Sequence, residues 1–255
     1  MKERLVLSNR INQKIVGVVN QPEGSKGLAV VMHGLGGTKE DPIVTSIAQS
    51  FLSQGITVVR FDTTNTFGES DGNYADATTT NFVHDLEDVI EQLKDTPWYT
   101  YPFYLAGHSL GGLAVTVFSE RNPKLVKGLG QAAPVISGQL TEAVRGSDYI
   151  RTWEERGFRQ EDDPIHPGLK WQHMLDRRKY DLLQFANRLT MPVLLVIGEN
   201  DTHIPVAHQK ILYSKLPSPK AIYIIPNASH ELDSDSARKD IYTIFSSWIN
   251  AVESE

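Results

Sequence analysis

Residues 103–112, Phe-Tyr-Leu-Ala-Gly-His-Ser-Leu-Gly-Gly, decide the fold of this chain. The stretch opens with an apolar run typical of a buried strand, and a segment with a helical pattern follows it. Between the two lies Gly-x-Ser-x-Gly at 107–111, a motif that in a strand–turn–helix setting holds a serine on a sharp turn. Glycines at both ends of the motif let the backbone pass close to its neighbours. The pattern predicts that Ser109 projects its hydroxyl from a strand end into a cleft.

The rest of the chain alternates short apolar runs with segments of helical periodicity. Strands are expected at 4–8, 14–20, 27–32, 56–61, 103–107, 125–133, 191–198 and 221–225. Helices are expected at 42–54, 79–95, from Ser109 to about 121, 205–215 and 236–252. Alternation of this kind predicts the α/β class, with a mostly parallel sheet and helices on both of its faces.

One segment breaks the alternation. Between residues 138 and 187 about a third of the residues are charged, against 22% for the whole chain. Acids and bases nearly balance there, and the charges fall on amphipathic segments rather than on a core pattern. We therefore expect one core built from residues 1–137 and 188–255, with 138–187 inserted over it as a small, mostly helical cap.

Composition restricts the classes of function. The chain has 255 residues, a hydrophobic fraction of 40% and a net charge of −6, which fit a globular protein and disfavour nucleic acid as a partner. It has no cysteine, which excludes disulfides, thiolate metal sites and a cysteine nucleophile. No signal-peptide core and no run of the roughly 20 apolar residues of a membrane span are present, so a cytoplasmic location is expected. Nothing in the pattern indicates an oligomeric state.

A serine hydroxyl is a weak nucleophile unless a base takes its proton. Asp201 follows the expected strand 191–198, and His230 follows the next strand, 221–225. Parallel strands place such loops at one edge of the sheet. The chain order Ser109, Asp201, His230 is that of nucleophile, acid and histidine in α/β-hydrolases. We predict that His230 takes the proton of Ser109 and that Asp201 orients the imidazole.

The same chemistry requires N–H donors for an oxyanion. The backbone amide of Leu110, directly after the serine, is one expected donor. The glycine-rich loop 33–38 follows another strand, and its backbone can approach a substrate closely. It is expected to supply the second donor at Leu35, through the main chain and independently of the side chain.

Other polar residues near these motifs have simpler explanations. Glu199 lies too close to its strand to be the orienting acid, and Asp233 lies too near His230 in the sequence. His203 is expected to be an exposed loop histidine. His166 and His173 lie seven residues apart without a close third ligand, a spacing that does not predict a metal site. No metal and no cofactor is expected.

Taken together, the motifs resemble those of serine hydrolases of the α/β-hydrolase superfamily. Within it the chain is similar to the small-cap esterases, which include monoacylglycerol lipases and cinnamoyl or feruloyl esterases. The resemblance rests on His-Gly-Leu-Gly-Gly at 33–37, Phe-Gly-Glu-Ser-Asp-Gly at 67–72, Gly-His-Ser-Leu-Gly-Gly at 107–112, Gly-Glu-Asn-Asp at 198–201 and Ser-His at 229–230. It implies an eight-stranded sheet, a catalytic triad and a lid over roughly 138–187 that selects the substrate.

These patterns predict a serine carboxylesterase that hydrolyses small or aromatic-acid esters, as feruloyl esterases do, through an acyl-enzyme on Ser109. A monoacylglycerol lipase, a thioesterase and an amidase or peptidase are alternatives on the same triad. A non-catalytic ligand-binding protein is an alternative of another class. Trp153, Phe158 and Trp171 in the insertion are candidates for binding the substrate, although they could equally pack the insertion onto the core. The expected partner is a small-molecule ester.

Overall fold

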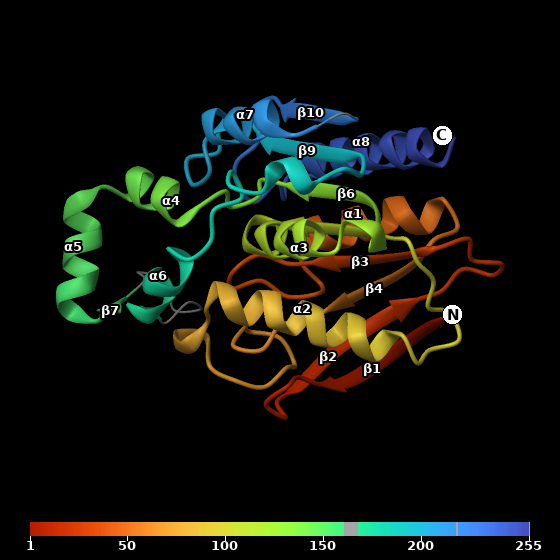
Figure 1. The fold of residues 1–255 in the computed structure, drawn as a ribbon, viewed down its shortest axis with the longest axis horizontal. Coiled ribbons are helices and arrows are strands. Elements are labelled where there is room, and N and C mark those ends of the chain that lie inside the picture. The colour runs from red at the N-terminus through yellow and green to blue at the C-terminus, as the bar shows by residue number, and fades with distance from the viewer. Residues whose placement is uncertain (161–167, 218, 255) are drawn as a thin grey trace.

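A computed structural model describes residues 1–160, 168–217 and 219–254 (Figure 1). Its main sheet has eight strands in the order β1-β2-β4-β3-β5-β6-β9-β10. The strands are β1 (Lys2–Ser8), β2 (Lys14–Asn20), β3 (Leu28–Met32), β4 (Thr57–Phe61), β5 (Phe103–His108), β6 (Val126–Ala132), β9 (Val193–Gly198) and β10 (Lys220–Ile225). The pairs β1–β2 and β2–β4 are antiparallel and the other neighbours are parallel, which confirms the predicted mostly parallel sheet.

Burial explains why the central strands read as continuous apolar runs. Every residue of β3, β4, β5 and β9 is buried, because helices cover the sheet on both faces. The antiparallel strand β1 lies at one edge and is mostly exposed. Strand β10 forms the other edge, and Tyr223 and Ile224 on it are exposed.

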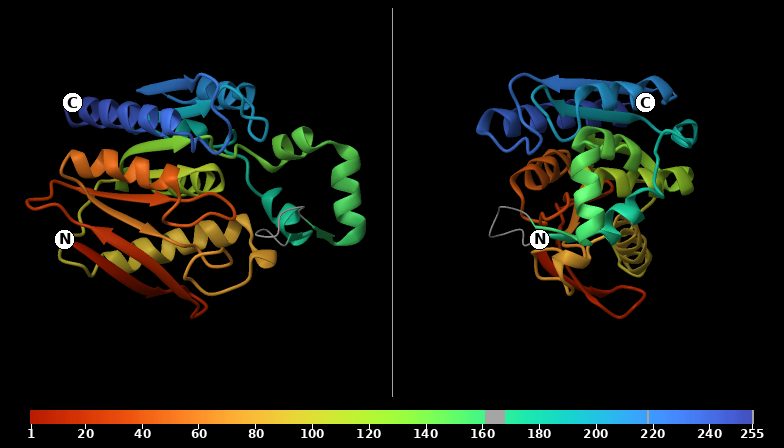
Figure 2. Two further views of the ribbon diagram at one scale, coloured as in Figure 1. Left: turned by 180° about the vertical axis from the view of Figure 1, so that it is seen from behind. Right: turned by 90° about the vertical axis from the view of Figure 1, so that its left-hand side faces the viewer.

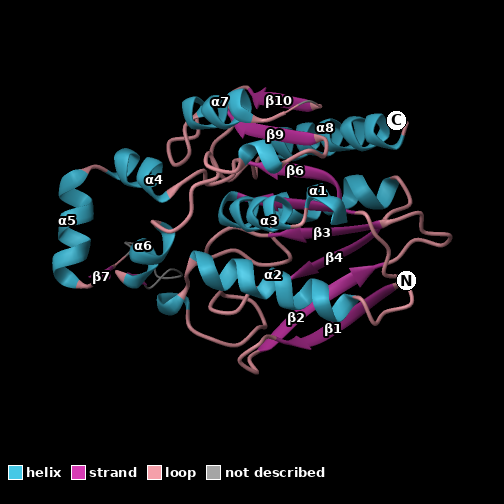
Figure 3. Ribbon diagram, in the orientation of Figure 1, coloured by secondary structure: helices cyan, strands magenta, loops and turns pink. Residues whose placement is uncertain are grey.

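Helices cover both faces of this sheet, as Figures 2 and 3 show. The apolar sides of α1 (Pro42–Ser53) and α8 (Asp235–Glu253) pack in one core layer. Those of α2 (Thr79–Leu93), α3 (Ser109–Arg121) and α7 (Val206–Lys215) pack in the layer on the opposite face. The bounds of all five lie within two residues of the expected helices. Short 3₁₀ turns at Tyr74–Asp76, Pro123–Leu125 and Ala186–Arg188 lie in the connections.

The chain between β6 and β9 leaves the sheet. It forms α4 (Gly138–Arg145), α5 (Ser147–Arg156), the two-residue strands β7 (Phe158–Arg159) and β8 (Leu169–Lys170), and α6 (Gln172–Arg177). In Figure 1 these elements extend to the left, beyond the carboxyl ends of the parallel strands. Because β6 and β9 are parallel neighbours, the connection leaves the carboxyl end of β6 and runs back along the sheet to the amino end of β9.

The projecting elements have a small core of their own. It contains Ile150, Trp153, Leu169 and Met174, packed against Tyr74 and Ala77 of the loop before α2. Asp176 of α6 accepts hydrogen bonds from the backbone and the hydroxyl of Thr80, at 2.7 and 2.8 Å. The projecting segment is thus fixed to the amino end of α2. Within the described residues, no helix has both the length and the apolar composition needed to cross a membrane.

Candidate active site

Ser109 lies at the tight turn between β5 and α3. Its φ of 52° falls in the left-handed region, which few non-glycine residues adopt. The turn is tight enough to exclude any side chain at the flanking glycines. A Cβ on Gly107 would lie 2.6 Å from the carbonyl carbon of Gly111, and one on Gly111 would lie 2.3 Å from the carbonyl oxygen of His33. The two glycines of the motif therefore have a steric role, as the sequence predicts.

The structure brings the three predicted side chains into one hydrogen-bonded chain. The Oγ atom of Ser109 lies 2.9 Å from Nε2 of His230, and Nδ1 of His230 lies 2.7 Å from Oδ2 of Asp201. With its proton on Nδ1, the imidazole donates to the carboxylate, and Nε2 can accept the serine proton. Asp201 and His230 are buried, while Ser109 is partly accessible.

Backbone donors fix the carboxylate of Asp201. Its Oδ1 atom accepts hydrogen bonds from the amides of His203 at 2.9 Å and Ile204 at 2.7 Å, which leaves Oδ2 for His230. Both donors belong to the loop that follows β9, so the strand, the loop and the acid form one rigid unit. The carboxylate therefore has a single orientation toward the imidazole.

A buried histidine supports His230 from behind. His108, the residue before Ser109, donates from Nε2 to the backbone oxygen of His230 at 3.0 Å. Burial, followed by the nearby imidazole of His230, lowers the pKa of His108 to about 3, so this ring stays neutral. His108 thereby links the turn at Ser109 to the loop that carries His230.

The predicted oxyanion donors lie in the loops next to Ser109. A Cβ on Gly34 would lie 3.1 Å from Cβ of Ser109, so the main chain of the loop after β3 runs directly beside the serine. The amide of Leu110 belongs to the first turn of α3, where backbone N–H groups have no partner within the helix. A cavity of about 240 Å³ borders residues 34–37, Ser109 and His230. Leu35 thus borders the space next to the serine, and the amide of Leu110 directly follows Ser109 in the chain.

Comparison with known families agrees with this geometry. The family model described as serine aminopeptidase, S33, matches residues 23–174, more than half of the chain. The chain belongs to the S33 family. It is accordingly a hydrolase, and its fold is that of the α/β-hydrolases. A second model, described as PhoPQ-activated pathogenicity-related protein, matches residues 170–254.

Individual relatives of this S33 hydrolase are distant. It is 26% identical over 261 residues to a monoacylglycerol lipase of Mycolicibacterium smegmatis, a match that covers 88% of each chain. Est1E from Butyrivibrio proteoclasticus, solved with ferulic acid bound, has a TM-score of 0.83 at 20% identity and covers 98% of this chain and 100% of its own. Mouse alpha/beta hydrolase domain-containing protein 10 has a TM-score of 0.81 at 18% identity, covering 98% and 99%. The structural likenesses show the shared fold.

In this S33 hydrolase a cleft of about 280 Å³ opens beside Ser109. One wall is formed by the triad region, with Leu35, Val135, His203 and Ile204. The other wall comes from the segment between β6 and β9 and from the loop before α2: Tyr74, Thr141, Arg145, Arg159 and Arg177. These arginines are not among the site residues predicted from the sequence. Alternating acids and bases in the insertion indicate solvated helix faces, and no local signal separates an arginine that faces a cleft from one that faces water.

The three aromatic candidates of the insertion are not among the residues that line this cleft. Trp153 is 3% exposed, and its indole N–H donates to the carbonyl of Leu169 at 3.0 Å within the small core of the segment. Trp171 packs edge-on against Trp153, and Phe158 is an exposed side chain in a separate groove. The two tryptophans therefore pack against each other and against Leu169 within the projecting segment.

The remaining histidines have identifiable surroundings. His203 is exposed, and its ring lies 5.1 Å from that of His230. The side chains of His203, His230 and Glu231 could reach a common metal ion, but both ring nitrogens of His230 already bond within the triad. His173 is buried and bonds through Nδ1 to the carbonyl of Ala77 at 2.8 Å. His166 lies outside the described residues.

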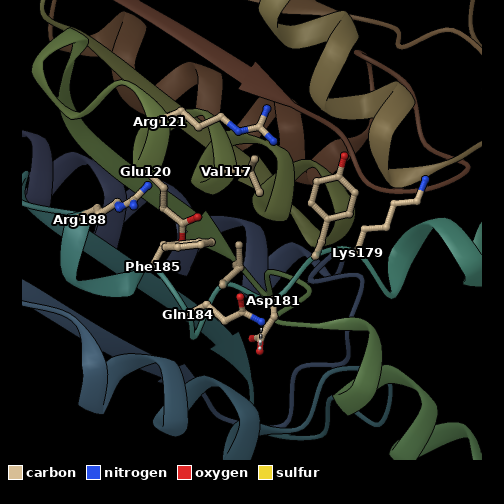
Figure 4. A pocket seen from close by; sticks show the side chains of 10 residues that line it. Val117, Glu120, Arg121, Lys179, Asp181, Gln184, Phe185 and Arg188 are labelled. Atoms are coloured by element: carbon tan, nitrogen blue, oxygen red, sulfur yellow. Dashed lines mark hydrogen bonds between the residues drawn. The ribbon is translucent and has the colours of Figure 1, made fainter.

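A second cavity of about 250 Å³ lies along α3 and is lined by none of the triad residues (Figure 4). Glu120 is buried in it beside Phe185 and Arg188, and its Oε1 atom has no hydrogen-bond partner. Burial raises the pKa of Glu120 to about 8, so the carboxyl group stays protonated at neutral pH. The residues that line the cavity have mixed charge and include no serine, threonine or histidine, so we assign the chemistry to the cleft at Ser109.

Proposed function

We propose that this S33 hydrolase is a serine carboxylesterase for small esters, including aromatic-acid esters, and that it acts through an acyl-enzyme on Ser109. One observation carries the proposal: the hydrogen-bonded chain from Ser109 Oγ to His230 Nε2, and from His230 Nδ1 to Asp201 Oδ2. A serine in this arrangement becomes a strong nucleophile when the imidazole accepts its proton.

The proposed reaction has two halves. In the first, His230 takes the proton from Ser109 as Oγ attacks the ester carbonyl, and the amides of Leu35 and Leu110 stabilise the oxyanion. The imidazolium then gives the proton to the departing alcohol, which leaves an acyl-serine. In the second half, His230 removes a proton from water, the hydroxide attacks the acyl group, and the acid departs as Oγ recovers its proton. Asp201 stabilises the imidazolium in both halves.

The size of the cleft favours a small substrate. Its volume of about 280 Å³ lies just below the usual range for ligand pockets, which begins at about 300 Å³. The relative named as a monoacylglycerol lipase and the neighbour solved with ferulic acid both support an ester as the substrate. We further propose that residues 138–187 act as a cap that selects the ester, since they supply one wall of the cleft.

The charge of the cleft argues against an aminopeptidase. Such an enzyme must hold the ammonium group of its substrate, which requires a carboxylate. Arg145, Arg159 and Arg177 instead put positive charge around the space beside Ser109, and Glu231 is the one cleft-lining carboxylate outside the triad among the described residues. A thioesterase or an amidase would use the same triad, and a panel of thioesters and anilides tests those alternatives.

A fluorophosphonate probe together with 4-nitrophenyl acetate tests the proposal. We expect the wild-type protein to be labelled and to release nitrophenol with a burst, and Ser109→Ala to lose both. Ser214→Ala on α7 is a matched control, because its hydroxyl is exposed and only contacts the carbonyl of Ile211. Unchanged labelling of Ser109→Ala would exclude this serine as the nucleophile. Absence of labelling and turnover in the wild type would favour a ligand-binding protein.

A further inference from the structure

The wall of the cleft opposite the triad contains a buried arginine without a counter-ion. Arg177, the last residue of α6, is 6% exposed, and its Nε atom has no hydrogen-bond partner. None of the ion pairs found in the described part of the chain includes it. Its neighbour Asp176 is already bonded to Thr80 and to Lys179. The guanidinium of Arg177 therefore lies at the cleft with its charge unbalanced by protein.

Two more guanidinium groups border the same cleft. Arg159 of β7 is 9% exposed and donates to the hydroxyl of Tyr149 at 3.0 Å, with its guanidinium 4.9 Å from the ring centre of Trp153. Arg145, at the end of α4, donates to the same hydroxyl at 3.4 Å and lies over the ring of Tyr149. The shared Tyr149 hydroxyl holds these two cations close together. Arg145 contacts the uncharged Tyr149, which positions the guanidinium without cancelling its charge.

The charges act on one another. Burial, followed by the charges of Arg145 and Arg159, lowers the pKa of Arg177 to about 9. An unpaired buried charge costs a large part of the net stability of a domain, and like charges nearby add to that cost. An apolar side chain at position 177 would avoid this cost in folding stability. A group that is costly in the free protein and faces the nucleophile is best explained by an anion that enters with the substrate.

We propose that the physiological substrate of this enzyme is an ester that carries its own carboxylate, and that Arg177, with Arg145, binds that carboxylate while Ser109 attacks the ester. This inference rests on the proposed esterase function and adds the substrate class to it. Guanidinium groups bind carboxylates through paired, charge-assisted hydrogen bonds. Because Ser109 and the arginines border one cleft of about 280 Å³, only a short spacer fits between the ester and the acid.

The matched substrates are half-esters of short dicarboxylic acids and their neutral counterparts. The mono-4-nitrophenyl ester of glutaric acid carries the charge on the acyl side, and 4-nitrophenyl pentanoate is its uncharged analogue. 4-Acetoxybenzoate carries the charge on the alcohol side, with its methyl ester as the analogue. We expect kcat/KM for at least one charged ester to exceed that of its analogue by about 10- to 100-fold, the range of a charge-assisted hydrogen bond.

Three variants test the role of the arginine. Arg177→Gln should bring the ratio of kcat/KM for the charged ester to that for its neutral analogue close to one, and Arg177→Lys should restore part of that ratio. Arg151→Gln is the matched control, because this exposed arginine of α5 pairs with Asp148 and lies outside the cleft. The preference should also weaken as salt rises.

The wild-type enzyme provides an independent test that does not depend on folding of a variant. Free glutarate should inhibit hydrolysis of the neutral ester competitively, and more strongly than glutaramide of the same length. A phosphonate analogue that inhibits better than glutarate would overturn the choice of a carboxylate. Equal kcat/KM for charged and neutral esters, with no inhibition by glutarate, would overturn the inference and leave the esterase function standing. Failure of every ester and of fluorophosphonate labelling would instead remove the esterase function and this inference with it.

Discussion

Replacing Asp201 by Asn tests the triad with almost no change of shape. In the native site Oδ1 accepts two backbone amides, those of His203 and Ile204, and Oδ2 accepts Nδ1–H of His230. An asparagine has one oxygen and one NH₂ group. The oxygen must face the two backbone donors, so the NH₂ group faces His230. The imidazole then carries its proton on Nε2 and points it at Ser109, which is the tautomer that cannot act as a base.

The size of the effect follows from the two backbone hydrogen bonds. Restoring the active tautomer requires turning the amide round, which leaves the amides of His203 and Ile204 opposite an NH₂ group. Each unsatisfied buried donor costs about 1–3 kcal/mol, so the active arrangement lies roughly 2–6 kcal/mol higher. That difference corresponds to a rate reduced by about 30-fold to 10⁴-fold.

The assay is the rate of acylation of Asp201→Asn by 4-nitrophenyl acetate, with thermal unfolding as the check on the fold. Glu199→Gln and Asp233→Asn are matched controls, because both carboxylates are exposed and neither contacts His230. We expect both controls to keep wild-type rates. An Asp201→Asn enzyme that retains more than about a tenth of the rate would refute the argument from the tautomer, as would a control that loses as much as Asp201→Asn.

Three further predictions concern stability and the oxyanion. Because the folded-state pKa of Glu120 is raised from 4.5 to about 8, the folded protein binds one proton more than the unfolded chain between these pH values, and its stability should fall as pH rises through that window. In urea unfolding, Glu120→Gln should remove a decline in unfolding free energy of a few kcal/mol between about pH 5 and pH 8. A variant whose unfolding free energy declines with pH as steeply as that of the wild type would count against the buried carboxyl group. Leu35→Ala keeps its backbone amide, so kcat should fall by far less than the roughly 10²–10³-fold drop that follows removal of an oxyanion donor. A drop in kcat of that size would show that the side chain of Leu35 is needed. Gly111→Ala places a methyl group 2.3 Å from the carbonyl oxygen of His33, so it should destabilise the fold by at least about 1–3 kcal/mol in urea unfolding. A variant as stable as the wild type would mean that the turn is looser than described.

Much of the fold could be predicted because its signals are local. Fully buried strands such as β3 and β9 appear as short apolar runs, and the helices between them carry a clear apolar side. The sequence order of strand and helix then leaves few possible topologies. The hydrogen-bonded arrangement of Ser109, Asp201 and His230 could be predicted for the same reason, since each residue follows a recognisable strand and the carboxyl ends of parallel strands converge.

The wall formed by residues 138–187 could not be predicted because its signals are not local. Trp153 was an equally good candidate for a pocket or a core, and its burial against Leu169 depends on how α5 folds back onto β8. Arg177 differs in sequence context very little from its neighbour Arg178. One is buried at the cleft and the other pairs with Glu142 at the surface, because α6 is oriented by the contact between Asp176 and Thr80. The prediction that 138–187 forms a separate cap that selects the substrate stays a prediction.

The left-handed backbone at Ser109 has a consequence for how the sequence can drift. Glycine, asparagine and aspartate tolerate a φ of 52° better than serine does, so every copy of this protein carries a small conformational penalty at position 109. On the mechanism proposed for Ser109, selection for a hydroxyl at that point maintains the penalty. In a lineage that no longer needs the reaction, exchange of this serine for glycine would be neutral or even favoured, and position 109 should be among the first to change. The identity of that single residue therefore records whether a descendant is still under selection for catalysis.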